Sequence, residues 1–186
     1  MTFRLSFRQS RVLNCFKRII VVLGGIHSGK SYTAKMFATE HLIKGENIIF
    51  LSNNPCELKE AFSSIGTILR NNRELSKRLS IDFRNHMIQY GDYDIQFTTP
   101  PEDIADIVIE MNKYKPCVVV ADGILEIPRL LCQISYLENH YGFLFKKVLI
   151  TGRPSNRIKD IIKSIDNNIE VFTWKYKNKL IKELIK

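Results

Sequence analysis

The feature that most constrains the fold is a glycine-rich loop that follows directly on an apolar run. The run, Ile19–Leu23, is continuously apolar and therefore predicts a strand covered on both faces. The loop matches the pattern GxxxxGK followed by Ser or Thr and reads Gly24-Gly25-Ile26-His27-Ser28-Gly29-Lys30-Ser31. Apolar residues then recur at helical spacing up to about Lys44, where Gly45 is placed to cap the helix. The sequence therefore predicts a strand, a tight loop and a helix in succession.

A strand, loop and helix in this order are suited to holding a phosphate chain. The loop amides turn inward, and the helix N-terminus adds the positive end of its dipole. We expect Lys30 to reach the β- and γ-phosphates of a nucleotide and Ser31 to ligate Mg²⁺ through its hydroxyl. Gly24 and Gly29 are expected to adopt backbone angles that other residues avoid, whereas His27 is interpreted as a solvated loop residue. The predicted nucleotide-binding residues are Gly24, Gly25, Ile26, His27, Ser28, Gly29, Lys30, Ser31 and Tyr32.

A second residue for the metal follows another apolar strand. Val118–Ala121 is apolar throughout and is followed by Asp122. An acid at the end of such a strand is where a P-loop NTPase holds Mg²⁺, so Asp122 is the expected Walker B residue, acting through water. The alternative is an Asp that caps the next helix. Asp82 and Asp94 are poorer candidates because no comparable apolar run precedes them.

Strands and helices alternate along most of the chain. The predicted strands are Ile19–Leu23, Asn47–Ser52, Cys117–Ala121, Lys147–Thr151 and Ile169–Trp174. The predicted helices run from about Ser31 to Lys44, from a capping box at Thr99 to Tyr114, from Ile127 to Tyr141 and from Ser155 to Ser164. Residues 66–97 are harder to interpret and contain the short strand candidates Leu79–Phe83 and Ile95–Phe97. This alternation predicts an α/β fold, a three-layer sandwich with a mainly parallel sheet between helices.

Length and composition are those of a globular protein with a basic surface. The 186 residues suffice for one domain, placed at 19–186 after a basic N-terminal segment, 1–18. The formal net charge of +9 attracts polyanions, either nucleic acid or an anionic membrane. No apolar run reaches the ~18 residues of a membrane span. The cysteines show no metal-binding spacing, and Cys117 and Cys132 are interpreted as small core residues, so we expect a reduced, intracellular and cytoplasmic protein.

The order of these motifs resembles the RecA-like division of P-loop ATPases. Within that division, the stretch from Val118 to Phe172 is similar to the FtsK–HerA group, which includes the DNA-packaging ATPases of viruses. The similar features are Asp122, the helix Ile127–Tyr141, the turn Thr151–Ser155, the helix Arg157–Ser164 and the strand after Asn167. The resemblance implies a RecA-like P-loop NTPase sheet that binds ATP and Mg²⁺, a homo-oligomer and DNA as a partner. For a viral member it implies the host cytoplasm.

The resemblance also implies catalytic roles, with two departures from the family pattern. The expected catalytic residues are Lys30, Asp122, Thr151 and Arg153. The group usually has a Glu directly after the Walker B Asp, where it polarises the attacking water, whereas this chain has Gly123. Its sensor Gln is replaced by Gly152, which leaves Thr151 as the nearest polar side chain able to sense the γ-phosphate. Glu57 and Glu126 are candidates to replace the missing Glu.

Two further features leave the interpretation open. The KaiC-like branch of the same division is a close competitor; its second strand usually ends with Glu-Glu, where this chain has Ser52-Asn53-Asn54-Pro55. In oligomeric motors a neighbouring subunit often supplies an arginine that stabilises γ-phosphate charge. The candidates are Arg129, Arg153 and Arg157, of which Arg153 is preferred.

Basic segments stand near both ends of the sequence. Trp174–Lys179 interleaves lysines with aromatic residues, which suits phosphate contact and base stacking, or the protection of an edge strand. The N-terminal bases are similarly ambiguous and comprise Arg4, Arg8, Arg11, Lys17 and Arg18. An anionic membrane surface is a third interpretation of these.

Three functions follow from the sequence, in order of preference. The first is an oligomeric ATPase that translocates or packages DNA. The second is a KaiC-like nucleotide-binding switch or assembly regulator with weak or absent hydrolysis, which Gly123 and Asn54 favour. The third is a small-molecule kinase, in which Arg153 and Arg157 would belong to a lid.

Overall fold

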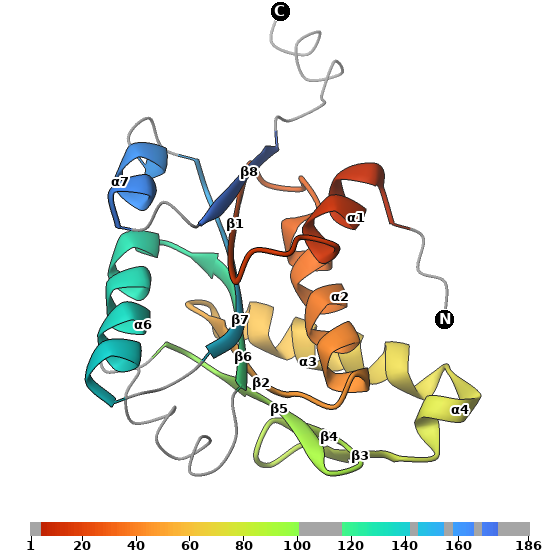
Figure 1. Ribbon diagram of the computed structural model, residues 1–186. Coiled ribbons are helices and arrows are strands. Elements are labelled where there is room, and N and C mark those ends of the chain that lie inside the picture. The colour runs from red at the N-terminus through yellow and green to blue at the C-terminus, as the bar shows by residue number, and fades with distance from the viewer. Residues whose placement is uncertain (1–4, 101–116, 142–144, 155–157, 166–168, 175–186) are drawn as a thin grey trace, which may run out of the picture.

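A computed structural model describes residues 5–100, 117–141, 145–154, 158–165 and 169–174. Within that part of the chain lies an eight-stranded sheet with the strand order β3-β4-β5-β2-β6-β7-β1-β8 (Figure 1). Apart from its first two residues, the helix expected from Thr99 to Tyr114 lies outside the described residues, and so does the basic segment after Trp174.

The larger part of the sheet is parallel, as the continuous apolar runs predict. Its strands are β1 (Ile19–Gly24), β2 (Asn47–Ser52), β5 (Tyr93–Thr98), β6 (Cys117–Ile124), β7 (Phe145–Gly152) and β8 (Glu170–Trp174). Every residue of β1 is buried, which agrees with a strand covered by helices on both faces.

One edge of the sheet is an antiparallel meander of β3 (Leu79–Asp82), β4 (Met87–Tyr90) and β5. Tyr90 and Tyr93 are register partners across the turn Gly91-Asp92, where Gly91 has a φ of 64°. A two-residue turn with glycine in this conformation is a common hairpin connection. Both short strand candidates of this region are present, and β4 between them is an addition to the predicted set.

Helices cover both faces of the sheet, which gives the predicted three-layer α/β fold. They are α1 (Phe7–Leu13), α2 (Lys30–Ile43), α3 (Pro55–Arg70), α4 (Arg73–Ser76), α6 (Ile127–Tyr141) and α7 (Ile158–Ile165). Side chains of α1, α2 and α3 form one core cluster with one face of the sheet, and those of α6 and α7 form a second cluster on the other face (Figure 1).

The helix α3 is the largest element that the sequence patterns do not predict. Asn54 caps its N-terminus by accepting a hydrogen bond from the backbone N–H of Cys56 at 2.9 Å, and Pro55 occupies the first turn. Its buried residues are Leu58, Ala61, Phe62, Ile65, Gly66 and Leu69. Their spacing is helical, but Ser63, Ser64 and Gly66 in this segment weaken the intrinsic helix propensity. Packing against the sheet, and not propensity, stabilises this helix.

Part of the N-terminal basic segment belongs to the folded core. Val12 of α1 is fully buried in the cluster that α2 and α3 form with the sheet. Arg11 lies over the ring of Phe172 on β8, 5.5 Å from its centroid, and Arg18 forms an ion pair with Glu138 on α6. Two of the N-terminal bases are thus engaged in contacts within the chain.

The two core cysteines of the sequence analysis have different environments. Cys117 is buried in β6, as expected, but Cys132 is exposed on α6, so its assignment to the core was wrong. The buried stripe of α6 is formed by Ile127, Leu130, Leu131, Ile134 and Leu137, and position 132 lies off it. Among the helices that the structure describes, none combines the length and the apolar character needed to cross a lipid bilayer.

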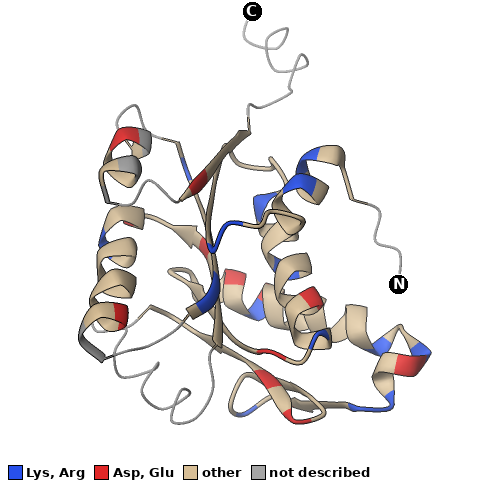
Figure 2. Ribbon diagram, in the orientation of Figure 1, with Lys and Arg blue, Asp and Glu red and all other residues tan. Residues whose placement is uncertain are grey.

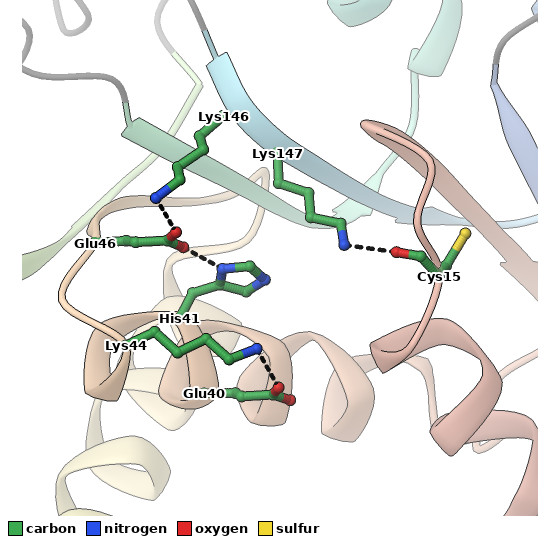
Figure 3. A network of polar contacts seen from close by, with 7 residues as sticks. All are labelled: Cys15, Glu40, His41, Lys44, Glu46, Lys146 and Lys147. Carbon is green, nitrogen blue, oxygen red and sulfur yellow. Dashed lines mark hydrogen bonds and ion pairs between the residues drawn. The ribbon is translucent and has the colours of Figure 1, made fainter.

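A polar network joins α2, β7 and the segment before β1, near the amino ends of the parallel strands (Figure 3). His41 of α2 contacts the carboxylate of Glu46 through Nδ1, and Lys146 forms an ion pair with the same carboxylate at 2.5 Å. Lys147 donates to the backbone carbonyl oxygen of Cys15 over 2.6 Å. These contacts fix the end of α2 and the start of β1 relative to β7.

Candidate functional site

The glycine-rich loop connects β1 to α2 at the carboxyl ends of the parallel strands. Gly29 directly precedes α2 with a φ of 89°, a left-handed conformation that favours glycine, as expected. His27 is exposed, as a solvated loop residue should be. Gly24 differs from the expectation, because its φ is not positive. A Cβ at Gly24 would lie 2.7 Å from Ser28 Oγ and 3.3 Å from Trp174 Cβ, so a larger residue there would have to displace these side chains.

Lys30 begins α2, and its ammonium group turns back over the loop. Nζ donates to the carbonyl oxygen of Gly25 over 2.7 Å and to Ser28 Oγ over 3.3 Å. Burial lowers the pKa of Lys30 below its ordinary value of 10.5; the charge of Asp122 opposes this, and that of Arg153 adds to it. A partly desolvated ammonium at a loop of this kind provides the counter-charge that phosphate oxygens require.

Three buried polar residues lie at the ends of neighbouring strands. Ser52 and Asp122 are register partners in the pairing of β2 with β6. Thr151 on β7 donates its hydroxyl to Asp122 Oδ1 over 2.5 Å and accepts a hydrogen bond from the N–H of Gly123 at 3.1 Å. Asp122 is 3% exposed, and a carboxylate buried so far requires such a partner. Thr151 therefore holds the orientation of Asp122.

The backbone turns sharply directly after Asp122. Gly123 has a φ of 69°, and the pairing of β6 with β7 is irregular at this point. A Cβ at Gly123 would lie 2.7 Å from Oε2 of Glu57 and 3.9 Å from Oγ of Ser52. The space beside Asp122 is thus taken by a side chain of α3. Because α6 begins only at Ile127, Asp122 is not the cap of the next helix.

Gly152, the second departure from the family pattern, also has a steric cause. A Cβ at this position would meet Cδ1 of Ile127 at 2.5 Å and the backbone oxygen of Ile124 at 2.9 Å. A contact below 3.0 Å with backbone cannot be relieved by turning a side chain. A glutamine at 152 is therefore incompatible with this packing of β6 and α6 against β7.

The loop and the strand ends open into a cleft of about 630 Å³. Organic ligands are typically held in clefts of about 300–1,000 Å³. The predicted site residues that line it are Ile26, His27, Ser28, Gly29, Lys30, Ser31, Tyr32, Asp122 and Arg153. Gly24, Gly25 and Thr151 do not line it, but Gly25 and Thr151 bond to the lining residues Lys30 and Asp122. The structure thus brings the predicted residues into one region.

The cleft also contains residues outside the predicted site. They are Lys35, Asn53, Asn54, Glu57, Glu60, Gly123, Ile124, Leu125 and Gly152. Lys35 pairs with Glu60 at 2.6 Å, which joins α2 to α3 across the cleft wall. The sequence could have indicated Lys35 as a lining residue, because it lies one turn after Ser31 on the predicted helix. Glu57 was already a candidate for the missing glutamate, whereas Glu60 became visible as a lining residue only with α3 in place.

Two oxygen donors in the cleft fit a magnesium ion bound together with a nucleotide. Ser31 lies at the start of α2 and is exposed, and Asp122 reaches the same cleft from β6. Hydroxyl and carboxylate oxygens are the ligands that Mg²⁺ prefers, usually with phosphate oxygens and water completing its shell. The donor set therefore fits the ion that the motif implies.

The three arginine candidates differ in position. Arg153 lies in the cleft, where it lowers the pKa of Lys30 together with burial. Arg129 is on α6 with its guanidinium 3.7 Å from the carboxylate of Glu126. Arg157 lies outside the described residues. Arg153 is thus the candidate that shares the cleft with the loop.

Comparison with solved structures identifies the fold. The large terminase of bacteriophage HK97 matches with a TM-score of 0.70 at 10% identity, over 96% of this chain and 41% of that chain. The large terminase ATPase domain of Thermus phage P74-26 matches with a TM-score of 0.64 at 13% identity, over 97% of this chain and 84% of that domain. A large terminase from another thermophilic bacteriophage gives 0.66 at 12% identity, over 97% of this chain and 49% of that chain.

These matches show a RecA-like P-loop fold, which confirms the predicted fold class. The chain spans less than half the length of the HK97 protein and of the third terminase, and most of the length of the P74-26 ATPase domain. No protein-family model matches the sequence, and a search of curated proteins gives no significant match.

Proposed function

We propose that this chain binds Mg·ATP in the cleft, hydrolyses it, and works as a subunit of an oligomeric motor that translocates or packages DNA. The observation that carries the proposal is the convergence of Lys30, Asp122 and the N-terminus of α2 in one cleft. That cleft lies at the carboxyl ends of parallel strands, where open α/β sheets bind their ligands.

The predicted site residues have roles that follow from their positions. The amides of the loop before α2 hold phosphate oxygens, and Lys30 neutralises charge on the β- and γ-phosphates. Ser31 and Asp122 hold Mg²⁺, which when bound neutralises charge on the same phosphates. Thr151 keeps Asp122 oriented and senses changes at the γ-phosphate through it. Arg153 stabilises γ-phosphate charge; its place in the cleft of its own chain favours action within one subunit.

The neighbours of known structure support the nucleotide part of the proposal. The P74-26 match is an ATPase domain by name, and the third terminase was solved in complexes with ATP-γ-S and with ADP. The resemblance of the sequence to the FtsK–HerA group adds DNA as the substrate that is moved. A homo-oligomer and a cytoplasmic location remain predictions from the sequence.

The charge of the chain supports DNA as the polymer. The net charge of +9 attracts a phosphate backbone. Figure 2 shows Lys and Arg along α1 and around α4, where the described bases include Arg8, Arg73 and Lys77. Binding through such residues weakens steeply with salt, because each neutralised phosphate releases counterions.

Calorimetry with Mg·ATP and a hydrolysis assay with and without double-stranded DNA test the proposal. Bound ATP at 100 times its dissociation constant stabilises the wild-type chain by about 2.7 kcal/mol. We expect Lys30→Ala to abolish both the heat and this stabilisation, and Lys44→Ala, at the far end of α2, to keep both. An absence of heat in the wild type would refute nucleotide binding. An absence of stimulation by any DNA at low salt would refute the translocase.

A nucleotide switch with slow turnover is the second candidate function, and Gly123 favours it. Without a carboxylate at this position the usual water-polarising group of the family is missing. A switch would retain ATP intact and would bind its partner differently in the ATP and ADP states. Equal partner affinity in both states would count against it.

A further inference from the structure

We infer that Glu57 on α3 activates the water that attacks the γ-phosphate, in place of a glutamate at position 123. This inference rests on the proposed ATPase function and deepens it. Hydrolysis needs a group that orients a water molecule and accepts its proton. The carboxylate would then come from the helix after β2 and not from the strand that carries Asp122.

The first support is the position of the carboxylate. Glu57 Oε2 lies 2.7 Å from the point that a Cβ on Gly123 would occupy. A side chain that begins at 123 would therefore enter the space that Glu57 already fills. Glu57 and Asp122 both line the cleft that contains Lys30.

The second support is the anchoring of Glu57. The hydroxyl of Ser52 donates to Glu57 Oε2 over 3.0 Å. Ser52 is fully buried at the end of β2, and its register partner on β6 is Asp122. A carboxylate bonded to a buried strand residue is held in a defined orientation, as a group that positions water must be. Glu57 itself is exposed, so that water reaches it.

The third support is electrostatic. The carboxylates of Asp122 and Glu57 both lie close enough to the Lys30 ammonium group for their charges to interact with it. The motif assigns that ammonium group to the β- and γ-phosphates. A base for the attacking water has to lie in this neighbourhood.

Other described carboxylates fit the role less well. Glu60 lines the same cleft, but its carboxylate pairs with Lys35 at 2.6 Å. Glu126 lies 3.7 Å from Arg129 and lines an adjacent cleft between Asn53 and α6, not the cleft of the loop. Of the two candidates that the sequence left open, the geometry thus favours Glu57.

The reaction balances with Glu57 as the base. The oxygen of water forms a bond to the γ-phosphorus while the bond from that phosphorus to the bridging oxygen of ADP breaks. The electron pair of the broken bond leaves with ADP, and the Glu57 carboxylate accepts a proton from the water. That proton passes to solvent as ADP and phosphate are released, so that no further reactant is needed.

The test compares Glu57→Gln with the control variant Glu40→Gln, which removes a carboxylate of α2 that lies outside the cleft and pairs with Lys44. Glutamine keeps an oxygen that accepts the hydrogen bond from Ser52. We expect E57Q to lower kcat roughly 10²–10⁴-fold, the usual contribution of a general base. We expect its dissociation constant for Mg·ATP, measured by calorimetry, to stay within about threefold of wild type. E40Q should leave kcat within about threefold.

Nucleotide analysis after acid quenching gives a second readout: E57Q should hold intact ATP for as long as it stays bound. If E57Q does not fold, Glu57→Asp serves as the second variant. It retains a carboxylate, one methylene further back, and should keep part of the wild-type rate. Turnover in E57Q or in Glu57→Ala equal to wild type overturns the inference and leaves the ATPase proposal intact. A wild type that binds ATP and never hydrolyses it overturns the inference together with the proposed hydrolysis, and favours the nucleotide switch. A wild type that binds no ATP overturns the proposed function itself.

Discussion

The hydroxyl of Thr151 donates to Oδ1 of Asp122, and this bond crosses from β7 to β6 between two buried side chains. The same hydroxyl accepts the N–H of Gly123, so that one oxygen atom fixes both the acid and the sharp turn after it. The sequence pointed to Thr151 as a sensor of the γ-phosphate. The structure adds a physical connection from Thr151 to the residue expected to hold the metal.

Replacing Thr151 by valine tests this connection. Valine has the shape of threonine without the hydroxyl, so the buried carboxylate of Asp122 loses a hydrogen bond. Bonds to charged groups typically contribute about 1.5–3 kcal/mol, and we expect the free energy of unfolding in urea to fall by that amount. Thr151→Ser, which keeps the hydroxyl, should recover most of the loss. If the valine variant were as stable as wild type, the bond would have no net effect on stability.

Gly123→Ala should destabilise the fold for two separable reasons. Its φ of 69° strains a residue with a Cβ by about 1–3 kcal/mol. The new Cβ also stands 2.7 Å from Glu57 Oε2. In the background Glu57→Ala only the backbone strain remains, so the cost of G123A should be smaller there. Urea denaturation of the four chains of this double-mutant cycle measures the difference. Equal costs in both backgrounds would show that Glu57 adds nothing to the cost of a Cβ at position 123.

Asn54→Ala should destabilise α3 through its N-terminus. The side chain of Asn54 accepts the N–H of Cys56, and loss of such a cap typically costs about 1 kcal/mol. Asn54→Asp keeps an accepting oxygen and should stay near wild type. Thermal unfolding monitored by circular dichroism compares the three chains. A melting temperature of the alanine variant equal to that of wild type would contradict the role of this cap.

The network of His41 and Glu46 should make the protein sensitive to acid. Burial lowers the pKa of His41 below its ordinary 6.5. Burial acts to raise the pKa of Glu46, but the hydrogen bonds from Lys146 and His41 outweigh it, so that this pKa lies below 4.5. Each group therefore has a lower pKa in the folded state than in the unfolded state. Between these two values the unfolded chain binds more protons than the folded one, so stability falls as the pH falls.

We therefore expect the free energy of unfolding to decline as the pH is lowered through the region below 6.5, and again below 4.5. His41→Asn removes the imidazole and keeps a donor for Glu46, so the first decline should become shallower. Denaturant titrations between neutral and acidic pH measure both steps. An identical pH profile in the variant would exclude His41 as the cause.

The sequence predicted the elements whose signal is continuous and local. β1, the loop and α2 follow from an apolar run and a fixed spacing of glycine, lysine and serine. β6 and Asp122 follow from a second apolar run. Strands that are buried on both faces are apolar throughout, so the sequence shows β1 and β6 clearly.

What the sequence did not reveal depends on packing between distant segments. α3 forms from a segment that contains serines and Gly66, because its apolar face is buried against the sheet. Cys132 fits an apolar pattern but lies one residue beyond the buried Leu131. The place of Glu57 beside Gly123 joins residues that are far apart in the chain, and nothing in their local sequence indicates it.

The pairing of β1 with β8 places Trp174 opposite Gly24, at the root of the loop. A displacement of β8 would therefore move β1 and the start of the loop with it, because one ladder of backbone hydrogen bonds joins the two strands.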